Sequence, residues 1–134
     1  MDRIVCTIVS ADETSREIGE VDLQTALQAF RSFPWQEQIS KVEQAGCYPT
    51  LSLGAGPRGE DGYLNVAASL EPNAFMVMIA TYKPGTVLGF IPKRKEAFLD
   101  LEPVEKGKVE KCLRTFFELP QRRLFDWIQQ QNEP

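Results

Sequence analysis

Between Pro49 and Pro92 the chain has the sequence PTLSLGAGPRGEDGYLNVAASLEPNAFMVMIATYKPGTVLGFIP. Leu51 and Leu53 alternate there with polar residues, and this period of two is typical of a strand with one buried face. Three further strand-like runs follow, at residues 63–70, 75–82 and 87–92. Glycine or proline separates the runs, and the predicted reversals lie at residues 54–62, 71–73 and 83–85. Because the links are short, the pattern predicts antiparallel strands joined as a meander.

More strand sequence is found on both sides of this meander. Residues 3–10 are rich in β-branched side chains and have two apolar faces, which predicts a strand in the interior of the sheet. Residues 98–101 are a candidate for a last strand. The acidic residues 11–20, which follow the first strand, are interpreted as a loop.

Helical periodicity precedes the meander. Asp22 is predicted to cap a helix whose apolar residues recur on one face, namely Leu23, Leu27 and Phe30. Pro34 interrupts this pattern, and the same spacing returns in residues 35–42 up to a predicted stop at Gly46. Two consecutive helices and one kinked helix both fit this sequence.

A second helical region follows Pro103. Apolar residues recur at helical spacing in residues 109–117 and, beyond Pro120, in residues 124–128. This pair of helices can cover one face of the sheet. The element order therefore predicts an α+β fold, an antiparallel sheet of about five strands covered by N-terminal and C-terminal helices. With 134 residues, the chain has the usual size of one domain, so residues 1–134 are expected to form a single α+β domain.

The composition favours binding over catalysis. The chain has no histidine, the side chain most often used for proton transfer near neutral pH and for metal ligation. The net charge of −4 argues against a dedicated nucleic-acid binder, since such proteins neutralise phosphates with Lys and Arg. We therefore expect no metal, no cofactor and no nucleic-acid partner.

Location is predicted from the cysteines and the apolar runs. Three widely spaced cysteines give no disulfide framework and no zinc motif, which favours a reduced cytoplasm. No secretory signal is recognisable, and the longest apolar stretch, residues 75–80, is far shorter than the roughly 20 residues of a membrane helix. A cytoplasmic protein without a membrane partner is expected.

Residues 54–59, GAGPRG, match the glycine pattern of a dinucleotide-binding turn. Such a turn must open into a helix whose N–H groups face the pyrophosphate, whereas here Glu60 and Asp61 precede a strand-like run. Two carboxylates would also repel phosphate. The motif is interpreted as a hairpin loop.

Other candidates for chemistry lack partners in the sequence. Cys47 has no histidine to activate it, and all three cysteines are expected to be structural. The carboxylate pairs Asp100 with Glu102 and Glu60 with Asp61 come without a recognisable acid/base partner or ligand set. The basic cluster of residues 93–95 can hold a phosphate or an acidic loop, but such a cluster more often caps a solvated turn.

The strongest binding feature is the acidic segment between the first strand and the first helix. Five carboxylates in eleven residues create a field that accelerates association with a basic surface, although a solvated loop is the alternative. Trp35 is a further candidate, because tryptophan is enriched among residues that dominate binding energy, with core packing as its alternative. The predicted partner is another protein with a basic surface, bound by a monomer or homodimer. The predicted contact residues are Asp12, Glu13, Glu17, Glu20, Asp22, Glu60, Asp61 and Trp35.

The arrangement resembles the small acidic immunity proteins of bacterial toxin–immunity pairs. The resemblance involves Pro34-Trp35 at a helix start, residues 49–53 (PTLSL), residues 62–66 (GYLNV) and the acidic α+β plan over the whole chain, without a diagnostic motif. It implies a cytoplasmic protein without a cofactor that occludes the active site of a cognate toxin. No functional residue is carried over from that group.

Two alternatives remain open at the level of sequence. In size and pI the chain also looks like an acidic secretion chaperone, which would dimerise and hold a client segment, although the leading strand departs from the usual helix-first order of those chaperones. A small carboxylate-dependent enzyme is the other alternative, and it requires a concave pocket with a perturbed carboxylate.

Overall fold

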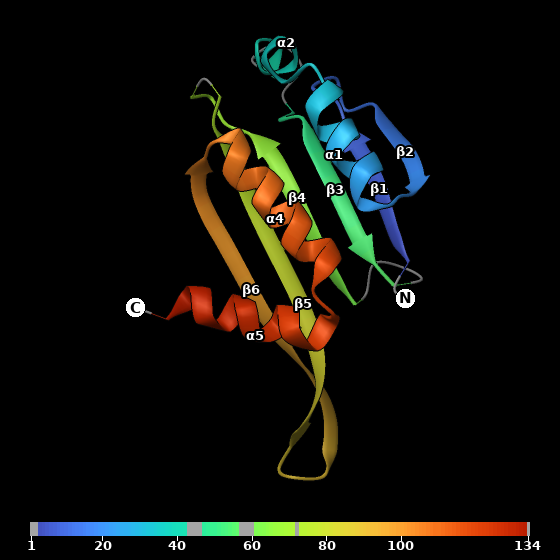
Figure 1. Cartoon of the computed structure of the whole chain (residues 1–134), viewed down its shortest axis with the longest axis vertical. Coiled ribbons are helices and arrows are strands. Elements are labelled where there is room, and N and C mark those ends of the chain that lie inside the picture. Colours follow the sequence, from blue (N-terminus) through green and yellow to red (C-terminus); the bar gives the residue numbers. More distant parts are fainter. Residues whose placement is uncertain (1–2, 43–46, 57–60, 72, 134) are drawn as a thin grey trace.

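The computed structural model describes residues 3–42, 47–56, 61–71 and 73–133, and in these residues six strands form one antiparallel sheet (Figure 1). The order across the sheet is β2-β1-β3-β4-β5-β6. The predicted α+β class and antiparallel pairing are confirmed, with six strands in place of about five. The strands are β1 (Ile4–Val9), β2 (Ser15–Glu20), β3 (Thr50–Ala55), β4 (Gly62–Ala68), β5 (Phe75–Val87) and β6 (Ile91–Val104).

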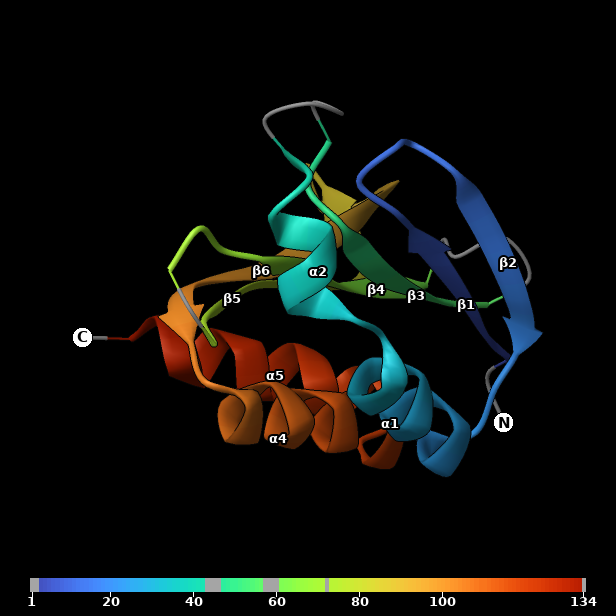
Figure 2. The ribbon, with the colours of Figure 1, turned by 90° about the horizontal axis from the view of Figure 1, so that it is seen from above.

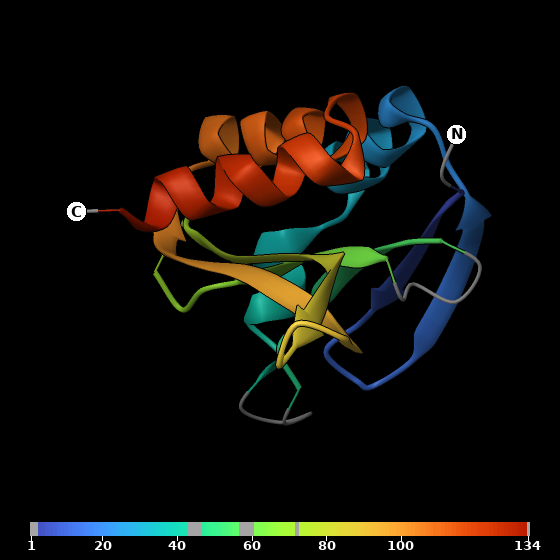
Figure 3. The same ribbon diagram turned by 90° about the horizontal axis from the view of Figure 1, so that it is seen from below.

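Three helices form a layer on one face of this sheet (Figures 2 and 3). They are α1 (Leu23–Ser32), α4 (Lys106–Glu118) and α5 (Gln121–Asn132), and the short helix α2 (Trp35–Ile39) follows α1. Helix α5 contacts β5 and β6, while α4 contacts α1, β4 and β5. The chain therefore has two separate helices around Pro34 rather than one kinked helix. Helix α2 ends at Ile39, earlier than predicted, and the expected stop at Gly46 lies outside the described residues.

Asp22 caps α1 as predicted. Its side-chain oxygen accepts a hydrogen bond from the backbone N–H of Thr25 at 2.8 Å, which satisfies one of the donors that every helix start leaves free. The helix then buries Ala26, Leu27 and Phe30 against the sheet. The capping residue and the apolar spacing together explain why the helix begins and faces the core where it does.

Aromatic side chains fill the core where α1 and α2 meet the sheet. Trp35 is only 4% exposed, and its indole N–H donates a hydrogen bond to the Phe30 carbonyl at 2.9 Å. The ring centroids of Phe30 and Phe75 lie 5.3 Å apart in an edge-to-face arrangement, which aromatic pairs prefer. Trp35 thus belongs to the core and presents almost no surface to a partner. Trp127 is half-buried and packs against the same core.

The acidic stretch after β1 is not one loop, as predicted, but a short turn followed by strand β2. The turn is closed by Thr14, whose backbone N–H donates to Asp12 Oδ1 at 3.0 Å, and Glu13 has a positive φ of 69°. Strand β2 pairs with β1 at the edge of the sheet, and most of its side chains are exposed. An exposed edge strand is polar along its length, so its sequence lacks the alternation that identifies half-buried strands.

The chain reversal predicted at residues 83–85 is also wrong, because these residues continue β5. The reversal occurs at Leu88 and Gly89, which have positive φ values of 57° and 80°, as tight hairpin turns require. Residues 87–92 are therefore no separate strand, and residues 98–101 belong to the long strand β6. Pro84 is tolerated because β4 does not extend beside this part of β5, so that side of the strand is an edge.

Truncation of the Phe30 side chain to a methyl group tests whether the aromatic cluster stabilises the fold. We expect Phe30→Ala to lower the free energy of unfolding by about 3–5 kcal/mol, since it removes buried apolar area and leaves a cavity. Phe98→Ala is the control, because Phe98 is 38% exposed. Urea unfolding followed by tryptophan fluorescence measures both changes. Equal losses for the two variants would contradict the assigned core.

Candidate functional site

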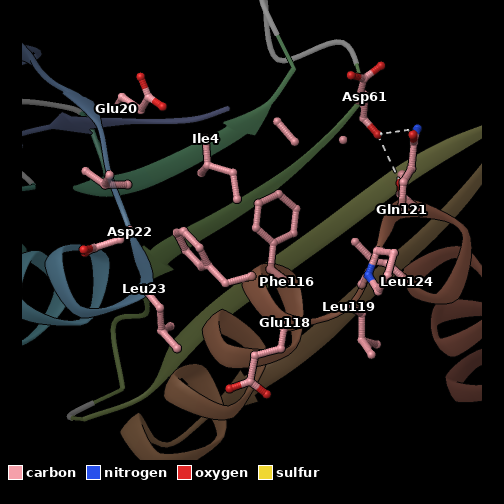
Figure 4. A pocket seen from close by; sticks show the side chains of 16 residues that line it. Ile4, Glu20, Asp22, Leu23, Asp61, Phe116, Glu118, Leu119, Gln121 and Leu124 are labelled. Atoms are coloured by element: carbon pink, nitrogen blue, oxygen red, sulfur yellow. Dashed lines mark hydrogen bonds between the residues drawn. The ribbon is translucent and has the colours of Figure 1, made fainter. Parts of the chain in front are cut away.

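A cleft of about 800 Å³ opens where the helix layer meets one end of the sheet (Figure 4). Its lining combines the start of β1, the segment from β2 into α1, the start of β4 and the connection between α4 and α5. The apolar side chains that line it include the buried residues Ile4, Phe116 and Leu124 and the half-buried residues Leu23, Phe117 and Leu119. The cleft has the size and the apolar floor of a ligand-binding site.

Carboxylates surround this apolar floor. Glu20, Asp22, Asp61 and Glu118 all line the cleft, and Figure 4 shows their carboxylates around Ile4 and Phe116. We call these four residues the acidic rim. Among the described lining residues there is no lysine and no arginine. The rim therefore gives the mouth of the cleft a negative potential suited to a cation.

Two rim residues have partners of their own. Arg3 Nε lies 3.3 Å from Glu20 Oε2, with both side chains 62% exposed, so this ion pair is weak and can exchange with another cation. The Asp22 carboxylate caps α1, and the hydrogen bonds from Thr25 hold its pKa below the usual value of 3.8. Asp22 therefore stays ionised at neutral pH while it caps the helix.

The Asp61 backbone fixes one corner of the cleft. Its carbonyl oxygen accepts hydrogen bonds from the Thr81 hydroxyl and from the Gln121 side-chain amide, each at 3.1 Å. The same Gln121 amide also donates to the Tyr82 carbonyl at 2.6 Å. These bonds join the start of β4, the middle of β5 and the start of α5.

Gly62 allows this corner to close. A Cβ atom at Gly62 would lie 2.9 Å from the carbonyl oxygen of Ala80 on the neighbouring strand, closer than real Cβ atoms come. A side chain at this position would push β4 away from β5 and open the corner. The glycine is therefore required by close backbone packing beside the cleft.

The fold brings together three of the predicted contact residues, because Asp61 joins Glu20 and Asp22 at the cleft although it lies much further along the sequence. Glu17 lies further along β2 on the exposed edge of the sheet. Asp12 and Glu13 form the turn at the opposite end of β2. Glu60 lies outside the described residues.

Sequence reasoning missed Glu118 and most of the floor of the cleft. Glu118 is the last residue of α4, and Phe116 and Phe117 were assigned only to a helix face. The local signal in the sequence was Leu119. It is an apolar residue in the short connection between α4 and Pro120, where polar residues are usual. The rest depends on which loops meet in space.

The other candidates lie elsewhere. Asp100 and Glu102 are exposed on β6 and do not line the cleft. Burial raises the pKa of the Cys6 thiol to about 11 and also raises that of Cys112, which keeps both thiols protonated, while Cys47 is half-buried. Within the described ranges, no three Cys, Asp or Glu residues are grouped as metal ligands would be.

Gly54 and Ala55 end strand β3, and β4 begins at Gly62, so the described flanks of the glycine motif are two paired strands. The glycine motif thus connects two antiparallel strands, as predicted, and does not open into a helix. Residues 57–60 of the motif lie outside the described residues.

Comparison with protein families, curated proteins and solved structures found no match to the chain. None of the helices in the described residues is long and apolar enough to cross a membrane.

The capping role of Asp22 predicts a pH-dependent contribution to stability. Because folding lowers the pKa of Asp22 below 3.8, its contribution is complete above that pH and is lost as the pH falls through the lower pKa of the folded state. Asp22→Ala should therefore destabilise the protein at pH 7 and have a much smaller effect at pH 2–3. Urea unfolding of both proteins at the two pH values measures this difference. An equal effect at both would contradict the charged cap.

Proposed function

We propose that this chain is a non-catalytic protein-binding domain whose cleft receives a segment of a partner that combines apolar and basic side chains. One observation carries the proposal: an apolar floor is surrounded by four carboxylates, and no basic residue lines the described cleft. An occupant of matching chemistry has an apolar side chain for the floor and lysine or arginine for the rim.

The floor and the rim would contribute differently to binding. Removing apolar surface from water contributes affinity, at about 25 cal/mol per Å². The rim carboxylates are mostly exposed, so their charges would raise the rate of association and favour basic partners more than they would raise affinity. Glu17 lies on β2, the strand that ends at Glu20, and extends the same negative field along the sheet edge.

The resemblance to immunity proteins suggests the kind of partner. A toxin domain whose substrate is anionic has a basic active site, and such a surface complements the acidic rim. In this form of the proposal the domain occludes that active site without altering it chemically. No catalytic residue and no cofactor is assigned to the cleft.

Charge reversal on the rim tests the proposal. We expect Glu20→Lys combined with Glu118→Lys to abolish capture of a basic protein from an extract of the source organism. Glu71→Lys combined with Asp126→Lys is the matched control, because it changes the net charge equally at exposed positions that do not line the cleft. The immobilised wild type and the control should retain the same protein, identified by mass spectrometry.

Kinetics with that purified protein completes the test. The association rate constant of the wild type should fall about tenfold or more between low and high salt, because salt screens exposed charges. The rim variant should already associate at this lower rate in low salt. Retention of the same protein by all three baits, or an association rate that does not depend on salt, would reject the cleft as the contact surface.

A further inference from the structure

Beyond Thr81 the strands β5 and β6 leave the sheet as a projecting two-stranded arm, which we define as residues 82–96 (Figures 1 and 3). Strand β4 begins at Gly62 opposite Thr81, so it does not pair with this part of β5. Six residues on each side, at about 3.3 Å per residue, make the arm about 20 Å long.

The tip of the arm is apolar and exposed. Leu88 is 78% exposed, Phe90 75% and Ile91 46%. Leu88 and Phe90 are the two most exposed large apolar side chains among the described residues. Large apolar groups gathered at the end of a projecting hairpin are typical of a surface that binds a partner.

The stem of the arm is basic. Lys83, Lys93, Arg94 and Lys95 lie on it, with Glu96 as its acidic residue. Lys83 lies over the ring of Phe125 and Arg94 over the ring of Tyr82, each 4.2 Å from the ring centroid, so these two cations also hold the root of the arm. Lys93 follows Ile91 after Pro92 and lies opposite Gly85, whereas Lys95 lies opposite Lys83, nearer the root of the arm.

We propose that the arm of one copy of this chain occupies the cleft of a second copy, and that the second arm occupies the first cleft in return. The inference rests on the proposed function, because the arm has the chemistry assigned there to the occupant. Leu88 and Phe90 match the apolar floor, and Lys93 and Lys95 match the acidic rim. Apolar burial and opposite charge act together in this pairing.

The positions of the arm and the cleft favour a reciprocal dimer. Gln121 lines the cleft, and its side-chain amide also bonds to Tyr82, the first residue of the arm. The arm and the cleft therefore lie at the same end of the molecule (Figures 1 and 4). A two-fold axis at this end brings both arms to both clefts at once, and such a closed, isologous dimer is the commonest form of oligomer.

A second copy explains the arm better than an anionic lipid surface does. Basic and apolar residues at a hairpin tip also suit such a membrane. However, the acidic rim lies beside the root of the arm, about 20 Å from the tip, so a membrane that held the tip would leave Glu118 and Asp61 without a cationic partner. In the dimer the same carboxylates face lysines.

The dimer also implies competition. A partner segment that enters the cleft must displace the arm of the second copy, so partner binding converts the dimer into monomers. The free protein is thereby the dimeric form, and the complex contains one copy of the chain.

Sedimentation velocity of the full chain tests the dimer. We expect the wild type to sediment with twice the mass of one chain at micromolar concentration. Leu88→Asn combined with Phe90→Ser should weaken the dimer more than about tenfold, because two apolar anchors are lost. Asparagine is chosen for Leu88 because it tolerates the positive φ of 57° at that position. Circular dichroism and thermal unfolding confirm that the variant folds.

A charge exchange makes the test specific. The arm variant Lys93→Glu with Lys95→Glu should be monomeric, since its acidic arm meets an acidic rim. The rim variant Glu20→Lys with Glu118→Lys should also be monomeric, because its rim no longer has a net negative charge to attract the basic arm. An equimolar mixture should form heterodimers, because the basic arm of the rim variant then meets the unchanged acidic rim, while the acidic arm of the arm variant meets a rim that carries two lysines. The exposed pair Glu71→Lys and Asp126→Lys should leave the dimer unchanged.

The outcomes separate this inference from the proposed function. A monomeric wild type, a dimer that tolerates both the arm and the rim variants, or a mixture that stays monomeric would overturn the inference. Binding of a monomeric wild type to phosphatidylserine vesicles, lost in the Leu88 and Phe90 variant, would overturn it in favour of a lipid surface. Loss of extract capture by the rim variant alongside a monomeric wild type would leave the proposed function standing alone.

Discussion

The Asp61 carbonyl oxygen is the point on which the cleft and the arm both depend. It accepts hydrogen bonds from the Thr81 hydroxyl and the Gln121 amide, so the start of β4, the middle of β5 and the start of α5 are tied at one place. Thr81 is almost fully buried, and leaving its hydroxyl without an acceptor would cost about 1–3 kcal/mol. Because β4 begins beside this junction while β5 continues past it, one side becomes a cleft and the other a projecting arm.

The charge of the molecule follows from the same layered plan. Helices α1, α4 and α5 cover one face of the sheet, and the ends of strands and helices meet at the ends of this layered fold (Figure 2). Strand β2 lies at the edge with most of its side chains exposed, and its last residue, Glu20, reaches the mouth of the cleft. Asp22 has two roles there, since it caps α1 and contributes charge to the rim.

Sequence reasoning succeeded where burial leaves a periodic pattern. Alternation identified β3, β-branched content identified β1, and helical spacing identified α1 and α4, which each bury one stripe of side chains. It failed for β2 and for the arm, which are exposed and therefore lack a pattern, and Pro84-Gly85 imitates a turn inside a strand. Glu20, Asp22 and Asp61 were predicted as contact residues from their charge alone. Their convergence with Glu118 depends on long-range packing, which no local pattern contains.

In the proposed function, the acidic rim determines which occupant the cleft prefers. Four carboxylates line the cleft around its apolar floor, and no lysine or arginine is among the described lining residues, although Arg3 pairs with the exposed side chain of Glu20. These carboxylates attract a cationic occupant and give no such advantage to an uncharged one. The preference for a cationic over an uncharged occupant therefore comes from the difference in their electrostatic energies in the cleft. The apolar floor contributes affinity to either occupant. A cleft that acts as proposed therefore selects its partner by charge.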